Sequence, residues 1–220
     1  MHTIRIWDLP TRLFHWALAA CFLGLVVTGN IGGSAMVWHF RFGYSMLCLL
    51  LFRLVWGFLG GFWSRWSQLP IHPKRVLSYV FAPTAQSPYA GHNPLGSLSI
   101  IAFMFALSLQ VATGLVSDDE ISNTGPFSAF VSNALVSWAT SWHQTNGKFI
   151  LLTLLGLHLL ALLWYRWKKN ERLVSAMLHG NKNLPEAHPH SVDNVKTSTL
   201  ALVVFLLAIG AVVLALSFGG

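Results

Sequence analysis

The sequence Ser141-Trp-His143-Gln-Thr-Asn-Gly-Lys-Phe-Ile-Leu-Leu-Thr-Leu-Leu-Gly-Leu-His158 places two histidines in one long apolar segment, which ends in a basic cluster at residues 166–169. If the segment forms one helix, the steps from His143 to His158 rise about 22 Å and make about four turns. Both imidazoles then lie on one broad face, near opposite sides of a membrane. This geometry suits two flat cofactors stacked along a bundle interior, provided that other helices supply matching histidines.

The composition identifies the class of protein. Of the 220 residues, 54% are apolar and only 10% are charged, and the mean hydropathy is +0.57. A chain of this length and composition is too apolar for a water-soluble domain. The sequence pI of about 9.9 could suggest nucleic-acid binding, but the basic residues lie beside apolar spans and are better read as topology signals. Cys21 and Cys48 lie inside apolar spans and are expected to be small core residues, with a disulfide as the weaker alternative.

Five membrane-spanning segments are predicted, at about residues 13–28, 38–59, 96–117, 141–164 and 199–218. The first resembles a signal peptide, but a histidine and a tryptophan near its start favour a membrane helix. A short interfacial helix is predicted at 73–82 and an amphipathic helix at 127–138. We therefore expect an all-α membrane protein, with a four-helix transmembrane domain over residues 1–180 and a linker with an additional C-terminal transmembrane helix over 181–220.

The placement of lysine and arginine predicts the orientation. If the spans alternate, one side of the membrane carries most of the basic residues, whereas the other has Arg41 and Lys148 near its helix ends. The residues on the basic side are Arg5, Arg12, Arg65, Lys74, Arg75, Arg166, Lys168, Lys169, Arg172, Lys182 and Lys196. By the positive-inside rule the N-terminus is cytoplasmic and the C-terminus lies outside.

This topology pairs four histidines by depth. His15 and His158 lie near the inner side, and His39 and His143 lie near the outer side. One histidine at a membrane boundary is often only a hydrogen-bonded interface residue. Two pairs at two depths across three helices favour ligation of a metal by neutral imidazoles.

Two histidines from opposing helices suit a six-coordinate haem iron, because the porphyrin supplies four further nitrogens. A zinc ion prefers a tetrahedral ligand set, and no span supplies a third ligand at either level. The sequence lacks Cys-x-x-Cys-His, so the predicted cofactors are two non-covalent b haems. The iron ligands are predicted to be His15 with His158 and His39 with His143.

Glycines and arginines near these levels complete the predicted cofactor site. Gly43 and Gly147 each follow an outer histidine by four residues and would leave room for a porphyrin edge, although ordinary helix packing explains them equally well. Arg53, helped by Arg12, is predicted to neutralise the propionates of the inner haem, and Arg41 or Lys148 those of the outer haem. The alternative for these cations is snorkelling to lipid headgroups, most readily for Arg12 and Lys148.

The combined motifs resemble the prokaryotic cytochrome b561 and nickel-iron hydrogenase b-type cytochrome family over about residues 4–180. They are Trp7-Asp-Leu-Pro-Thr-Arg-Leu-Phe-His15-Trp, His39-x-x-x-Gly43-Tyr, Phe52-Arg53-Leu-Val-Trp-Gly57, Gly91-His-Asn-Pro-Leu-Gly96, Thr113-Gly-Leu and the His143…His158 helix. The resemblance implies a four-helix bundle that holds two b haems, with the same histidine pairs as ligands. Two features depart from the family: the fifteen-residue step from His143 to His158, where fourteen is expected, and the fifth span. The longer step calls for a bulge or for a helix that begins just after His143.

The resemblance implies an electron-transfer subunit in the bacterial inner membrane, without catalytic residues of its own. It would pass electrons between membrane quinone and an outer redox protein, such as a cytochrome c or a hydrogenase-like partner. Bis-histidine ligation leaves no open iron position, which disfavours oxygen activation at the metal. Two alternatives remain: a self-contained superoxide:quinone oxidoreductase, and a haem-free membrane anchor or transport protein. His92, in the Gly-His-Asn-Pro motif, is interpreted as part of a structural turn rather than a quinone site.

Overall fold

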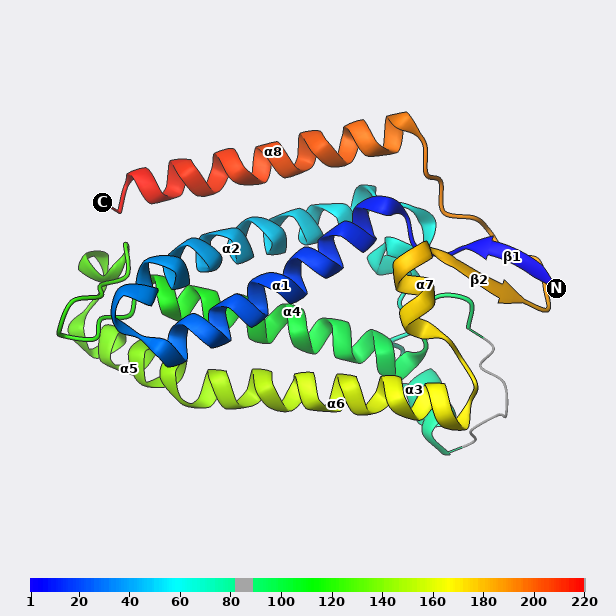
Figure 1. Ribbon diagram of the computed structural model, residues 1–220, viewed down its shortest axis with the longest axis horizontal. Coiled ribbons are helices and arrows are strands. Elements are labelled where there is room, and N and C mark those ends of the chain that lie inside the picture. Colours follow the sequence, from blue (N-terminus) through cyan, green and yellow to red (C-terminus); the bar gives the residue numbers. More distant parts are fainter. Residues whose placement is uncertain (82–88, 220) are drawn as a thin grey trace. The chain divides into compact units, whose positions relative to one another are not determined.

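The structure, a computed structural model, describes residues 1–81 and 89–219, and most of these are helical (Figure 1). Its long helices are α1 (Leu9–Ile31), α2 (Met36–Leu59), α4 (Pro94–Leu115), α6 (Asn146–Lys168) and α8 (Val195–Ser217). The shorter helices are α3 (Pro73–Phe81), α5 (Asn133–Gln144) and α7 (Leu173–His179), and the strands are β1 (His2–Arg5) and β2 (Asn181–Leu184). Single 3-10 turns lie at Gly33–Ala35, Phe62–Ser64, Trp66–Gln68 and Ser128–Phe130.

The predicted all-α membrane fold is confirmed. Five segments are long and apolar enough to cross a membrane: Leu9–Ile31, Gly33–Leu59, Pro94–Leu115, Asn133–Lys168 and Val195–Ser217. The interfacial helix predicted at 73–82 is present as α3, while Ala82 lies outside the described residues. The two short strands were not predicted, because each has only four residues and gains its hydrogen bonds from a partner about 180 positions away.

In the fourth span His143 and His158 do not lie on one continuous helix; a second helix begins just after His143, as the fifteen-residue step between them suggested. His143 is in the last turn of α5, and α6 begins at Asn146. Thr145, between them, has φ −116° and ψ −84°, outside the helical region. Its hydroxyl donates to the carbonyl of Ser141 at 2.5 Å, a local bond that bends helices. The amphipathic helix predicted at 127–138 begins later, at Asn133, because Ser132 caps it by accepting the Leu135 N–H.

The chain divides into two compact units. The first unit comprises Met1–Phe14, Leu54–Ala102 and Leu154–Val203, and the second comprises His15–Arg53, Phe103–Thr153 and Val204–Gly220. The boundary cuts the helices α1, α2, α4, α6 and α8, so each of them contributes one end to each unit. The units therefore correspond to the two ends of the membrane spans along the chain.

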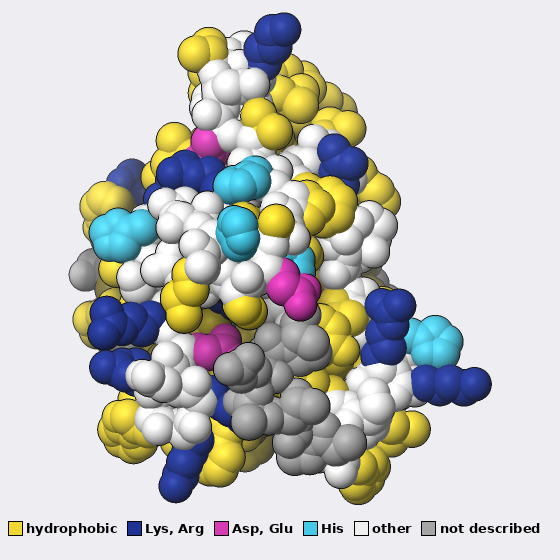
Figure 2. Space-filling view, turned by 90° about the vertical axis from the view of Figure 1, so that its right-hand side faces the viewer, with side chains coloured by type: hydrophobic (Ala, Val, Ile, Leu, Met, Phe, Trp, Pro, Cys, Tyr) yellow, Lys and Arg dark blue, Asp and Glu magenta, His cyan; other side chains and the backbone are white. Residues whose placement is uncertain are grey.

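The first unit contains the antiparallel strands, in a register that pairs His2 with Leu184 and Arg5 with Asn181. A small core lies against this sheet, formed by the buried residues Ile4, Ile6, Trp7, Ala90 and Ala176. The unit holds eleven of the fourteen Lys and Arg residues and four of the seven acidic residues, a formal net charge of +7. Figure 2 shows Lys and Arg side chains spread over the face that carries the N-terminus and the strands.

The second unit is apolar and electrically balanced, with three basic and three acidic residues. Its core consists of the buried side chains Met46 and Leu50 of α2, Leu107 of α4 and Leu151 of α6. Partly buried residues of α1, such as Leu18 and Phe22, pack against this core. Four helices thus converge on one apolar cluster in this unit.

Candidate cofactor site

His39, the fourth residue of α2, is held by α1. Its Nδ1 lies 3.1 Å from the carbonyl oxygen of Leu25 and 3.2 Å from the hydroxyl oxygen of Thr28. The Thr28 hydroxyl donates its own proton to the Gly24 carbonyl at 2.6 Å, so it accepts from the imidazole. Gly29 lets α1 approach closely, because a Cβ there would lie 3.0 Å from His39 Cε1. His39 is therefore fixed with Nδ1–H as a donor.

His143, near the end of α5, is held in a corresponding way by α4. Its Nδ1 lies 2.8 Å from the backbone carbonyl of Gln110, and the Gln110 side-chain amide donates to the His143 carbonyl at 2.8 Å. Gly114, one turn further along α4, allows this approach, since a Cβ there would lie only 2.7 Å from His143 Cε1. The reciprocal bonds fix both the backbone and the ring of His143.

The two imidazoles face each other across the second unit. Their ring centres are 6.0 Å apart and their planes are inclined by 85°. A carbonyl oxygen only accepts, so each Nδ1 carries the proton and each Nε2 keeps its lone pair. The second unit thus presents two neutral imidazoles with the tautomer that ligates metals through Nε2.

This arrangement fits an iron held from opposite sides. A metal–imidazole bond is about 2 Å long, so two opposed ligands have their ring centres about 6 Å apart. Gly43 lies one turn after His39 on α2, and no atom lies within 4 Å of where its Cβ would be, so this helix face has room for a flat group. Within residues 1–81 and 89–219, no three His, Cys, Asp or Glu side chains form a cluster that could hold a bare metal ion.

Gly147, the second glycine predicted to make room for a cofactor, has close protein neighbours. A Cβ at this position would meet the side-chain oxygen of Gln110, and it would lie 2.8 Å from Nε1 of Trp142. Gly147 is itself buried. Because Gly147 has no side chain, Gln110 and Trp142 can pack directly against its backbone.

The other predicted pair belongs to different units. His15 lies on α1 in the second unit, where it is half-buried and contacts Trp16 edge-on with ring centres 5.2 Å apart. His158 lies on α6 in the first unit and is also half-buried. Each is within a membrane span, as the sequence predicts.

Comparison with known proteins identifies the family. A model of the family described as prokaryotic cytochrome b561 matches residues 6–180. The chain belongs to this family. Cytochrome b561 proteins of this group are membrane cytochromes, which implies haem b and a role in electron transfer.

Three curated relatives of this cytochrome b561 family member are named as probable B-type cytochrome subunits of Ni/Fe-hydrogenase. The Bradyrhizobium diazoefficiens protein is 23% identical over 82% of this chain and 86% of its own length. The Azotobacter vinelandii protein is 31% identical over 46% of this chain and 52% of its own. The Escherichia coli K12 protein, named as the hydrogenase 1 subunit, is 23% identical over 81% and 90%. No solved structure is significantly similar to the chain.

The arginines predicted to serve this cytochrome lie in distinct settings. Arg53 is only 5% exposed within α2, which is unusual for a cation in an apolar span. Arg12 donates to the Leu178 carbonyl at 2.6 Å, and its Nη2 lies 3.8 Å from the Asp193 carboxylate. At the other end, Arg41 lies 4.8 Å above the Trp38 ring, and Lys148 donates to the side-chain oxygen of Asn30 at 2.7 Å.

The sequence analysis missed the residues that orient the imidazoles. Thr28 and Gln110 are polar residues inside apolar spans, and this unusual placement is the signal that would have found them. It also missed Asp8, whose fully buried carboxylate accepts from the N–H groups of Thr11 and Gly61 and the Ser64 hydroxyl at 2.8 to 2.9 Å. An aspartate directly before an apolar helix with a proline in its first turn is an N-cap signal. Asp8 caps α1 and also ties it to the segment after α2.

His92 has a structural position in the first unit. Its ring centre lies 4.4 Å from that of Trp7. The adjacent Asn93 caps α4, accepting the Gly96 N–H at 2.8 Å, and donates to the Tyr165 hydroxyl at 2.8 Å. The Gly-His-Asn-Pro motif thus forms a helix entry, in agreement with its interpretation as a turn.

Proposed function

We propose that this protein is a di-haem b-type cytochrome that carries electrons across the membrane between the quinone pool and a redox protein on the outer side. The observation that supports this proposal most directly is the His39–His143 pair. Both rings donate through Nδ1 to oxygen acceptors, which leaves each Nε2 lone pair free to bind a metal, and the ring centres are 6.0 Å apart. An imidazole held only for packing does not need a facing partner at 6.0 Å.

In this proposal His39 and His143 ligate one haem, and His15 and His158 ligate the other. Each bound haem supplies a one-electron redox centre with no open coordination position. The Nδ1 bonds to Leu25, Thr28 and Gln110 orient the imidazoles. Arg53, with Arg12, balances the propionates of one haem, and Arg41 or Lys148 those of the other.

The names of the relatives support a hydrogenase-like partner, and an outer cytochrome c is the other redox protein of suitable chemistry. The charge asymmetry supports an orientation in the inner membrane of a bacterium. The first unit, with a net charge of +7, would face the cytoplasm together with the N-terminus, and the C-terminus would lie in the periplasm. Residues 1–180 then form the cytochrome domain, and 181–220 add a linker and a further transmembrane helix.

The test is the haem content of the purified full-length protein and of single histidine variants. Reduced b-type bands and a pyridine-haemochrome ratio near two haems per chain are expected. His39→Ala and His143→Ala should lose the same haem, and His158→Ala the other. His179→Ala, an exposed histidine at the end of α7, serves as the control and should keep both.

Three results would contradict the proposal. Absence of haem would favour the alternative function of a haem-free membrane anchor or transport protein. One haem per chain would reject the two-centre relay, and retention of both haems in His39→Ala would reject the ligand pair. Reduction of quinone by superoxide without any added protein would instead favour the self-contained oxidoreductase.

A further inference from the structure

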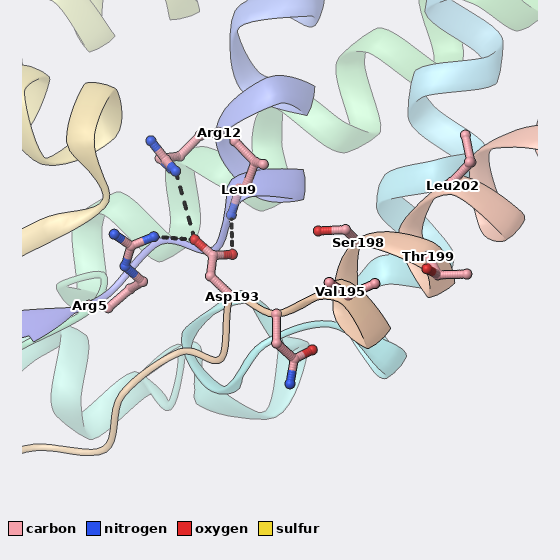
Figure 3. A pocket seen from close by; sticks show the side chains of 9 residues that line it. Arg5, Leu9, Arg12, Asp193, Val195, Ser198, Thr199 and Leu202 are labelled. Carbon is pink, nitrogen blue, oxygen red and sulfur yellow. Dashed lines mark hydrogen bonds and ion pairs between the residues drawn. The ribbon is translucent and has the colours of Figure 1, made fainter.

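A cavity of about 550 Å³ lies in the first unit, where α1 and α8 begin (Figure 3). Arg5, Leu9 and Arg12 line it from the N-terminal segment, and Asp193, Ser198 and Leu202 are among the residues that line it from the start of α8. Its volume falls within the range of about 300 to 1,000 Å³ that small-molecule sites occupy. None of the four proposed iron ligands lines it, whereas Arg12, proposed above to help balance a haem propionate, does.

The cavity has an excess of positive charge. Arg5 pairs with the Asp193 carboxylate, and Nη2 of Arg12 lies 3.8 Å from the same carboxylate. The other oxygen of Asp193 accepts the backbone N–H of Leu9 at 2.7 Å. Two guanidinium groups against one carboxylate leave a net charge of +1. Asp193 thus positions both arginines at the cavity without neutralising them.

Neutral donors and apolar side chains complete the lining. The hydroxyls of Ser198 and Thr199 lie on the first turns of α8, where the helix dipole also favours an anion (Figure 3). Leu9, Val195 and Leu202 supply apolar surface and are 39%, 81% and 56% exposed. Since α1 and α8 are both membrane spans, their first turns lie at the surface of the bilayer.

We propose that this cavity binds the phosphate of an anionic phospholipid. Guanidinium groups bind phosphate oxygens through paired, charge-assisted hydrogen bonds, and serine and threonine hydroxyls add further donors. The apolar lining favours a lipid over free phosphate, because acyl chains can follow Leu202 and Leu9 into the bilayer. The bound headgroup would bridge the N-terminal segment and the start of α8, which Asp193 and Ser191 already join.

The experiment titrates the detergent-purified full-length protein with phosphatidylglycerol, with phosphatidylcholine and with inorganic phosphate, and counts bound molecules by native mass spectrometry. Wild-type protein should retain phosphatidylglycerol preferentially. Arg5→Gln should weaken its retention about tenfold, since a charge-assisted hydrogen bond contributes about 1.5 to 3 kcal/mol. Ser198→Glu should weaken it by about tenfold or more, because it places a carboxylate in the cavity and leaves the Arg5–Asp193 pair intact.

Arg172→Gln is the matched control, because Arg172 is an exposed cation of the same unit that does not line the cavity. It should change retention less than about twofold, as expected for one dispersed surface charge. An equal loss in Arg172→Gln and Arg5→Gln, equal retention of the two lipids, or undiminished binding by Ser198→Glu would each overturn the proposal. Binding of inorganic phosphate in place of phosphatidylglycerol would show that the cavity holds free phosphate and not a lipid, which would overturn the proposal. Thermal unfolding of each variant checks that it is folded.

Discussion

The two units of this cytochrome are organised by different forces. The described residues of the first unit hold a buried carboxylate, two short strands, two single 3-10 turns, two short helices and a net charge of +7. The second has balanced charges and a core of Met and Leu side chains from four helices, and its polar contacts gather around two imidazoles. The first is thus held together largely by hydrogen bonds, and the second by apolar packing beside two imidazoles whose ring centres are 6.0 Å apart.

The comparison shows where polar groups are tolerated in a membrane protein. At the membrane surface, water and headgroups offer polar groups alternative hydrogen-bond partners. A buried polar network there is stable only when its groups are hydrogen-bonded to one another, as they are around the Asp8 carboxylate. Deep in a span, a polar group remains only with a specific partner. Thr28 and Gln110 have one each in His39 and His143.

The largest effect is expected from Asp8→Ala, which tests whether the first unit depends on its polar network. The change leaves the N–H groups of Thr11 and Gly61 and the Ser64 hydroxyl without their acceptor. Loss of these bonds should lower the free energy of unfolding by about 3 kcal/mol or more, as measured by thermal unfolding in detergent. Glu186→Ala, which removes an exposed carboxylate from the same unit, should have almost no effect. Equal stability of the two variants would show that the network contributes little.

Gly114→Ala tests whether the second unit is built around His143. The new Cβ would lie 2.7 Å from His143 Cε1, so the ring must leave its position against the Gln110 carbonyl. Haem affinity in this unit should fall about tenfold or more, as for other changes behind a metal ligand, while the other haem stays bound. The measurement is haem retention on dilution, followed in the visible spectrum. Gly210→Ala is the control, since no other described side chain lies within 4 Å of its new Cβ. Equal haem loss in Gly210→Ala and Gly114→Ala would contradict the role of the His143 position in haem binding.

A smaller effect is expected at Lys182 of the first unit. Burial lowers the pKa of Lys182, and the Glu171 carboxylate 3.8 Å away raises it in part. The folded state therefore disfavours the ammonium form, and stability should increase as the pH rises through the lowered pKa toward the usual value of 10.5. Lys182→Met should remove this pH dependence and stabilise the protein by less than about 1 kcal/mol at neutral pH. Unfolding midpoints between pH 7 and 10 test this, with exposed Lys168→Met as the control. A stability that falls over this range would contradict the expected sign.

The smallest effect is expected in the loop after α4, in the second unit. Asp119 accepts the side-chain amide of Asn123 and the N–H groups of Asn123, Ser122 and Ile121, and these bonds hold its pKa well below the usual range. Its stabilising contribution should therefore be complete above the usual pKa of 3.8 and decline as the pH falls from there toward the lowered pKa. Asp119→Ala should speed amide exchange at residues 121–123 and leave both haems bound, whereas Glu120→Ala should not. Unchanged exchange in Asp119→Ala would show that the loop is held by other contacts.

Much of the site could be read from the residues because membrane spans obey simple geometric rules. The depth of His39 and His143 followed from span order alone, and the structure brings these two rings to 6.0 Å. Their acceptors could not be predicted, because they are backbone carbonyls of Leu25 and Gln110 on neighbouring helices. Every residue has such a carbonyl, and helix rotation decides which one faces a given ring. The fifteen-residue step from His143 to His158 predicted a bulge or a helix that begins just after His143, and the structure has such a break. Its position at Thr145 could not be predicted, because threonine is compatible with a helix and the bend depends on a local hydrogen bond that apolar periodicity does not reveal.

The sequence by itself determined that the chain has five apolar spans long enough to cross a membrane and which ends of those spans are basic. These properties depend on composition and order, since a bilayer sorts side chains by hydropathy and charge along a single axis. The tertiary structure alone decided the tautomers of His39 and His143, the burial of Asp8 and the meeting of Arg5, Arg12 and Asp193. Each of these depends on lateral packing, which brings together groups from distant parts of the chain and leaves no periodic trace in the sequence.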